Sequence, residues 1–133
     1  MNGSNRYLFD TNAIIHLLRG DSALEKLLES IDWFGVSIIS QLEFLSFDGL
    51  EKEDEILFDQ FLDRVQVIGL EPYFDDLISS AISIRKNHKL KLPDAIIAAT
   101  ALSANATLIT ADNDFQKVSG LMVGLLKGEN LSI

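Results

Sequence analysis

The sequence predicts an α/β fold, in which helices cover both faces of a central, mostly parallel sheet of four or five strands. Two observations predict this class. Short runs of apolar and β-branched residues alternate along the chain with longer segments whose apolar residues recur at helical spacing. The chain of 133 residues, 47% hydrophobic and 23% charged, has an ordinary globular composition and suits a single domain, residues 1–133.

The N-terminal part of the chain predicts two strands, each followed by helices. The expected elements, in order, are a strand at residues 6–10, helices at 11–20 and 21–30, a strand at 34–39 and a helix from Ser40. Apolar, β-branched runs predict the strands. Gly20 suits a helix C-terminus, Asp21 or Ser22 suits an N-cap, and Ser40 with Glu43 matches a capping box.

The C-terminal part continues the same alternation. The expected elements are a helix after the acidic run at residues 51–55, a strand at 65–70, helices from Pro72 to Asn87 and at 92–106, a strand at 107–110, a short helix within 112–118 and a strand at 121–126. Acidic residues suit a helix N-terminus, and so does Pro93. The helix at 92–106 is apolar on nearly every side, which predicts that it is buried.

Four or five acidic residues should meet at one edge of this sheet. Asp10 ends the first strand, Glu43 lies just after the second, Asp94 opens the buried helix, and Asp112 and Asp114 follow the strand at 107–110. In parallel sheets, functional groups gather beyond the carboxyl ends of the strands. Each acid also has a structural explanation by itself, as a helix cap, a capping-box partner, a first-turn charge or a turn former.

Considered together, these acids favour a cation site. Like charges at one rim repel unless a cation is bound, so the joint argument favours Asp10 as a metal ligand and leaves capping to Thr11 or Asn12. The chain has no cysteine and no suitably spaced histidine pair, which favours Mg²⁺, with Mn²⁺ as a substitute, over Zn²⁺. The EF-hand pattern for calcium fails after Asp112, because Lys117 stands where glycine is needed.

An ordered set of motifs resembles a known family. The motifs are "LFDTNAII", "SQLEFL", "KLPDAIIAATAL" and "ATLITADNDF". The sequence resembles PIN-domain ribonucleases, especially the VapC-type toxins of type II toxin–antitoxin systems. This resemblance extends over essentially the whole chain and implies a PIN-like three-layer α/β/α fold.

The resemblance also implies residue roles, an activity and partners. It implies a catalytic acidic quartet of Asp10, Glu43, Asp94 and Asp112, a fifth metal-binding acid in Asp114, and supporting polar residues in Thr11, Asn12 and Thr110. The implied activity is metal-dependent cleavage of single-stranded or looped RNA. A cognate antitoxin protein and a homodimer are the implied partners.

The net charge of −9 opposes long-range attraction to RNA or to an anionic membrane, so an RNA substrate needs local cations. The segment at residues 85–91 supplies Arg85, Lys86, Lys89 and Lys91, either as a solvated helix end or as phosphate contacts. Arg19 is a weaker candidate for phosphate contact.

The sequence shows no membrane-spanning or export segment, which predicts a cytoplasmic protein. Phe44, Phe47 and Phe58 suit either the core or a dimer surface, and the core is the expected place.

Two other functions compete with a ribonuclease. A haloacid-dehalogenase-like phosphotransferase also places an aspartate after its first strand, but it needs a second aspartate where this chain has Asn12. A catalytically idle PIN-like domain would bind RNA or protein through the same surface. The intact set of acids argues against that second reading.

Overall fold

The computed structural model describes residues 5–70, 75–128 and 130–133. The strands are β1 (Arg6–Phe9), β2 (Trp33–Ser37), β3 (Gln66–Ile68), β4 (Thr107–Thr110), β5 (Val123–Lys127) and β6 (Asn130–Ser132). The helices are α1 (Thr11–Leu18), α2 (Ser22–Leu27), α3 (Ile38–Leu45), α4 (Lys52–Leu62), α5 (Asp75–His88) and α6 (Leu92–Ser103), with short 3-10 helices η1 (Leu28–Ser30) and η3 (Asn113–Lys117).

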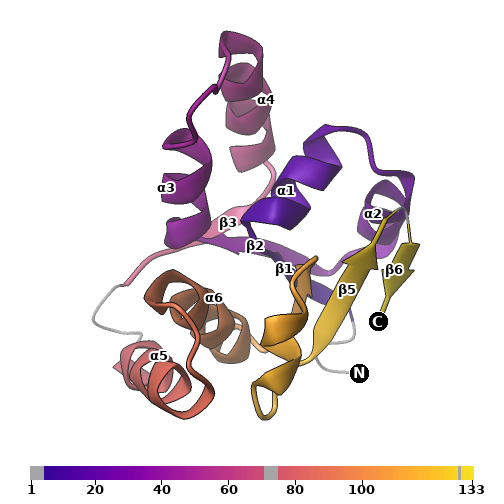
Figure 1. Ribbon diagram of the computed structural model, residues 1–133. Helices are drawn as coiled ribbons and strands as arrows, with labels where there is room; N and C mark the ends of the chain where they lie inside the picture. The colour runs from indigo at the N-terminus through magenta and orange to yellow at the C-terminus, as the bar shows by residue number, and fades with distance from the viewer. Residues whose placement is uncertain (1–4, 71–74, 129) are drawn as a thin grey trace.

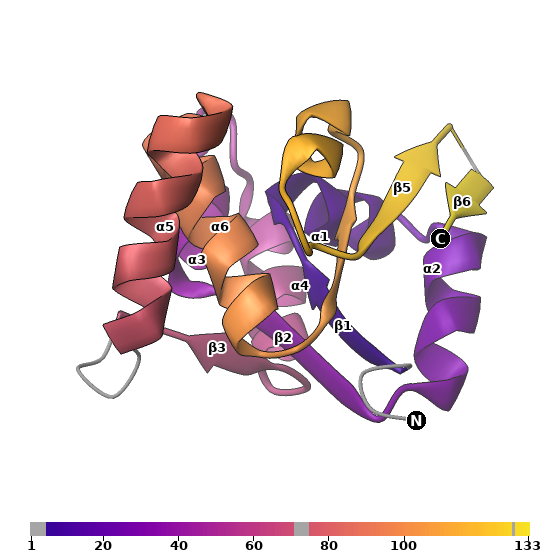
Figure 2. The same cartoon turned by 90° about the horizontal axis from the view of Figure 1, so that it is seen from below.

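The described strands form one sheet in the order β3-β2-β1-β4-β5-β6. All neighbouring strands are parallel except β5 and β6. Helices α1, α2 and α4 cover one face and α5 and α6 cover the other (Figures 1 and 2). The predicted three-layer α/β/α fold is therefore confirmed.

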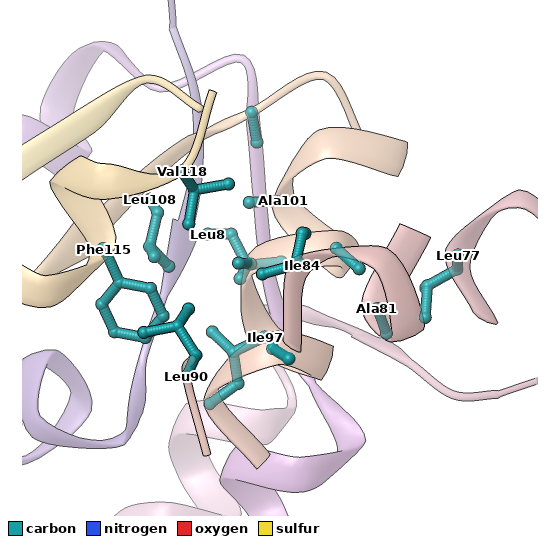
Figure 3. Packing of buried hydrophobic residues seen from close by; sticks show 14 of the residues in the cluster. Leu8, Leu77, Ala81, Ile84, Leu90, Ile97, Ala101, Leu108, Phe115 and Val118 are labelled. Atoms are coloured by element: carbon teal, nitrogen blue, oxygen red, sulfur yellow. The ribbon is translucent and has the colours of Figure 1, made fainter. Parts of the chain in front are cut away.

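Two buried clusters, one on each face of the sheet, hold these layers together. In β1, Leu8 joins the cluster beneath α5 and α6, whereas Tyr7 and Phe9 join the cluster beneath α1, α2 and α4. This alternation follows from the two-residue repeat of a strand. Figure 3 shows the first cluster, where Leu8 and Leu108 of the central strands lie among side chains of the helices.

Several predicted boundaries need correction. Among the described residues the sheet has six strands rather than four or five, because the chain turns at Gly128 (φ +62°) and adds β6. Ile38 and Ile39, expected in a strand, belong to α3. The helix expected at residues 92–106 ends at Ser103. The expected start of α5 at Pro72 lies outside the described residues.

The aromatic residues also divide differently from the prediction. Phe44 and Phe58 stack in the core with ring centroids 4.2 Å apart, as expected. Phe47, expected in the same core, is 65% exposed. It lies just beyond the end of α3, where the chain leaves the core.

In the part of the chain that the structure describes, no helix is long and apolar enough to cross a membrane.

Candidate active site

The carboxyl edge of the sheet gathers side chains from distant parts of the chain. Asp10 directly follows β1, and Thr110, the last residue of β4, precedes Asp112 by two positions. Glu43 lies on α3, the helix that follows β2, and Asp94 lies in the first turn of α6. Because parallel strands end at the same edge, residues that are 100 positions apart in sequence come into contact there.

Asp10 is a buried acid that also caps α1. Its Oδ1 accepts a hydrogen bond of 2.9 Å from the backbone N–H of Ala13, and its Oδ2 accepts one from the hydroxyl of Thr110. The expectation that Thr11 or Asn12 would cap this helix is wrong, because the chain enters α1 immediately after the extended residue Asp10. Each carboxylate oxygen has a second lone pair, so capping and cation binding are compatible.

Thr110 connects two of the acids through one hydroxyl group. Its Oγ1 donates to Asp10 and accepts a hydrogen bond of 3.0 Å from the backbone N–H of Asp112. Asp112 in turn caps η3, since its Oδ1 accepts a hydrogen bond of 2.9 Å from the backbone N–H of Asp114. The Thr110 side chain is fully buried, so it fixes the relative position of the two acids.

Glu43 is oriented by a contact from the neighbouring helix. The hydroxyl of Thr11 donates a hydrogen bond of 2.6 Å to Oε1 of Glu43. The predicted capping box of Ser40 and Glu43 does not form, because α3 begins two residues earlier than expected and Ser37 is its N-cap. Glu43 therefore lies in the second turn of α3, away from the orphan N–H groups of the helix start.

Burial and repulsion change the ionisation of Asp10. Burial is the largest cause and raises the pKa of its carboxyl from 3.8 to about 6. The hydrogen bonds from Thr110 and Ala13 oppose this rise, because they stabilise the charged form. Negative charge on Asp94 and Asp112 adds to it.

Burial and repulsion also change the ionisation of Asp94. Burial raises the pKa of its carboxyl, and repulsion from Asp112 and Glu43 raises it further, whereas the positive charge of Lys91 lowers it. The four carboxylates of the predicted quartet are thus close enough to repel one another. A nearby cation is the arrangement that relieves such repulsion.

The four acids line a single pocket of about 350 Å³. The other described residues that line it are Thr11, Asn12, Ile15, Phe47, Ile97 and Phe115. The sequence reasoning missed the four apolar ones, although a signal was present. Ile15 and Ile97 each lie three or four positions after a predicted site residue of the same helix, a spacing that places two residues on one helix face.

The acids do not surround a ready-made metal position. Within the described residues, no group of three or more His, Asp or Glu side chains is arranged to hold an ion. Asp10, Glu43 and Asp112 each accept hydrogen bonds from groups of the protein itself. A cation in this pocket would share these oxygens with the donors that already hold them.

Asp114, the fifth predicted acid, lies at the margin of the site. Its Oδ1 is 3.4 Å from Nζ of Lys117, and it is not among the described residues that line the pocket. Its negative charge nevertheless contributes to the raised pKa of Asp94. The structure therefore brings together the quartet and places the fifth acid beside it.

The basic segment at residues 85–91, which covers the end of α5 and the turn before α6, borders the site through one residue. Lys91 is the N-cap residue of α6, and its charge lowers the pKa of Asp94. Arg85 donates a hydrogen bond of 2.9 Å to a backbone carbonyl of the turn that follows α5, while Lys86 and Lys89 are exposed. None of these four cations is among the described lining residues of the pocket, so RNA contact by them stays a prediction.

Comparison with known families gives a match over most of the chain. The model of the PIN domain family matches residues 7–121. Curated proteins give no significant match.

Solved structures with a similar fold include toxin–antitoxin assemblies. VapBC2 from Rickettsia felis, bound to a DNA fragment from its promoter, is 21% identical with a TM-score of 0.75, over 91% of this chain and 98% of that one. A toxin–antitoxin complex from Klebsiella pneumoniae is 30% identical with a TM-score of 0.70, over 87% and 95%. VapBC-1 from nontypeable Haemophilus influenzae is 24% identical with a TM-score of 0.73, over 90% and 96%.

Proposed function

Because the chain belongs to the PIN-domain family, we propose that it is a cytoplasmic, Mg²⁺-dependent endoribonuclease that cleaves single-stranded or looped RNA. We propose further that it is the toxin of a toxin–antitoxin pair. The likeness to the Klebsiella pneumoniae toxin–antitoxin complex, at 30% identity over 87% of this chain, supports that assignment.

The convergence of four carboxylates in one pocket is the observation that carries the proposal. Asp10, Glu43, Asp94 and Asp112 come from four separate segments and line the same cavity. Helix capping explains hydrogen bonds of Asp10 and Asp112, but it does not explain why all four acids share one pocket at the cost of mutual repulsion. A polyanionic substrate in such a pocket requires a cation between the acids and the phosphate.

The chemistry of the pocket fits Mg²⁺. Its carboxylates and the Thr11 hydroxyl present oxygen atoms, which Mg²⁺ prefers, and Mn²⁺ can substitute. The chain has no cysteine, and neither of its histidines is among the described residues that line the pocket. The residues that would hold the ion are Asp10, Glu43, Asp94 and Asp112, with Asp114 beside them.

Bound Mg²⁺ supplies a water of lowered pKa and offsets the charge that builds on the phosphoryl oxygens. The role of the protein's own residues is to hold the acids in position. Asp10 is fixed at both oxygens, by Ala13 and by Thr110, and Glu43 is fixed by Thr11. Two apolar side chains that line the pocket, Ile97 and Phe115, are almost fully buried and form a wall of low dielectric beside these acids.

We propose that the protein forms a homodimer and binds a cognate antitoxin. Four apolar side chains on α3 and α5 remain between 42% and 57% exposed in the single chain: Leu42, Leu45, Ile78 and Ile82. Such exposure on two helices that both contact α6 supports an interface. Light scattering after size exclusion should give about twice the monomer mass of 14.8 kDa, and a monomeric mass at micromolar concentration would contradict the dimer.

Cleavage of a mixed RNA pool tests the proposed activity. We expect cleavage with Mg²⁺ or Mn²⁺, no cleavage with EDTA, and a loss of at least about 100-fold in Asp10→Asn and Asp94→Asn. Asp59→Asn, which changes an exposed acid on α4, is the charge-matched control. The products should carry 5′-phosphate and 3′-hydroxyl ends, because water is the nucleophile. Cleavage that survives EDTA or both pocket substitutions would rule out the metal mechanism, and RNA binding without cleavage would favour an idle domain.

A further inference from the structure

A second, smaller pocket of about 130 Å³ lies beside the acidic pocket, and we call it the flanking groove. Residues of α1, α3 and α4, and of the segment between α3 and α4, line it. Figure 1 shows α1 opposite α3 and α4. The two pockets share Thr11, Ile15, Glu43 and Phe47. A chain molecule that occupies the acidic pocket can therefore continue directly into the flanking groove.

Phe47 lies on the boundary between the two pockets. Its side chain is 65% exposed, unlike Phe44 and Phe58, which stack on each other in the core. Proteins recognise single-stranded RNA mainly by stacking unpaired bases on exposed aromatic rings. The ring of Phe47 therefore offers a stacking surface immediately beside the proposed point of cleavage.

Arg19 is the single cation among the described residues that line either pocket. It is the exposed C-cap residue of α1, and no ion pair involves it within the described ranges. It lies nine residues after Asp10, which corresponds to about 13 Å along the helix axis. At that distance its guanidinium suits a phosphate other than the scissile one.

We propose that the flanking groove binds the nucleotide next to the scissile phosphate, with its base stacked on Phe47 and its outward phosphate on Arg19. This inference rests on the proposed ribonuclease activity. A peptide of a partner protein is the competing occupant. The nucleotide is favoured because the groove opens into the pocket where the scissile phosphodiester must lie. Asp54, the acid that lines only the groove, already accepts a hydrogen bond of 3.0 Å from the backbone N–H of Glu51.

Steady-state kinetics on short single-stranded RNA, with cleavage positions mapped, test the role of Phe47. Phe47→Leu keeps an apolar side chain but removes the ring, so KM should rise roughly tenfold with little change in kcat, and the base preference at one position beside the cut should weaken. Phe47→Trp should retain the wild-type KM and the base preference. Ile56→Ala, which changes an exposed apolar residue of α4 that lines neither pocket, is the control.

The salt dependence of kcat/KM tests the role of Arg19. Loss of one phosphate contact to a single strand should reduce the slope of log kcat/KM against log salt by about 0.7 in Arg19→Gln. Arg19→Lys should retain most of the slope. Lys26→Gln on α2 removes the same charge from an exposed position that lines neither pocket, and its slope should equal that of the wild type.

These results separate the inference from the activity on which it rests. A wild-type protein that fails to cleave any RNA with Mg²⁺ overturns both. If the wild type cleaves while Phe47→Leu keeps its KM and base preference, the groove proposal is overturned and the ribonuclease assignment stands. The groove proposal would also be overturned if Phe47→Leu changed the oligomeric mass and left KM unchanged. The ring would then contact another protein chain rather than a base.

Discussion

Asp10 has two roles with opposite effects on the stability of the metal-free protein. As the N-cap of α1 and the acceptor of the Thr110 hydroxyl it makes hydrogen bonds that stabilise the fold. As a buried charge near Asp94 and Asp112 it is destabilising, which is why its pKa rises to about 6. An asparagine at this position keeps the shape and an acceptor oxygen but removes the charge.

The pH dependence of Asp10→Asn follows from this shift. The pKa of Asp10 is about 6 in the folded protein against 3.8 as its usual value, so the folded state binds the proton more tightly. The free energy of unfolding should therefore fall as pH rises from 4 to 6, by up to about 3 kcal/mol. In EDTA, urea unfolding should show Asp10→Asn to be more stable than the wild type at pH 7.5 and equally stable near pH 4. A less stable variant at pH 7.5 would contradict the buried-charge account.

Thr110 should matter for both activity and stability. Thr110→Val removes the donor to Asp10 and the acceptor of the Asp112 N–H, so we expect a loss of roughly 1–3 kcal/mol in unfolding free energy. We also expect kcat/KM for RNA to fall at least about tenfold, because both acids lose their common anchor. Thr100→Val is the matched control, since that buried hydroxyl bonds only to Ile96 within its own helix. Equal activities of the two variants would argue against an anchoring role of Thr110.

At the scale of elements, the start of α3 decides what Glu43 can do. Ser37 caps the helix by accepting a hydrogen bond of 3.0 Å from the N–H of Ile39. The hydroxyl of Ser40, by contrast, is buried without a hydrogen-bond partner in the described ranges. The helix is capped at Ser37, about one turn before Ser40. Glu43 therefore lies opposite Thr11 rather than at the helix terminus.

The two serines should respond differently to the same substitution. Ser37→Ala should lower the free energy of unfolding by about 1 kcal/mol, because it removes an N-cap. Ser40→Ala should leave stability unchanged or raise it slightly, because an unpaired buried hydroxyl is unfavourable. Chemical denaturation of both variants checks this directly. A larger loss in Ser40→Ala than in Ser37→Ala would support the capping box that the sequence predicts.

Periodicity and turn chemistry predicted most elements, and the errors have physical causes. Ile38 and Ile39 read as a strand because they are β-branched, but the cap at Ser37 begins a helix that tertiary packing stabilises. β6 was missed because its three residues, which follow a turn at Gly128, are too few for an alternating pattern to be recognised. Phe47 was assigned to the core from its residue type alone, which says nothing of where α3 ends.

At the scale of the whole molecule, the convergence of the quartet was predictable and its detailed contacts were not. Parallel strands end at one edge, so the positions of Asp10 and Asp112 followed from strand order. The hydrogen bond from Thr11 to Glu43 and the bridging hydroxyl of Thr110 depend on side-chain rotamers, which a single sequence does not encode locally. The side-chain contacts within the pocket could therefore be learned only from the structure.

The charge of the whole molecule bears on the role that we propose for a cation. With 20 acidic against 11 basic residues, the protein repels RNA at long range, and the acids of the pocket add to that repulsion. In the proposed mechanism, a divalent ion in the pocket would offset part of the negative charge of the acids where the scissile phosphate must lie. Catalysis and substrate binding should therefore depend on the same site.

Titration of the metal-free protein with Mn²⁺, followed by calorimetry, tests this central claim most directly. We expect the wild type to bind one or two ions and Asp94→Asn to bind them at least about tenfold more weakly, because a carboxylate ligand is lost. Asp59→Asn, with the same change in net charge, should bind as the wild type does. Equal binding by the wild type and Asp94→Asn, or no binding by the wild type, would contradict the account.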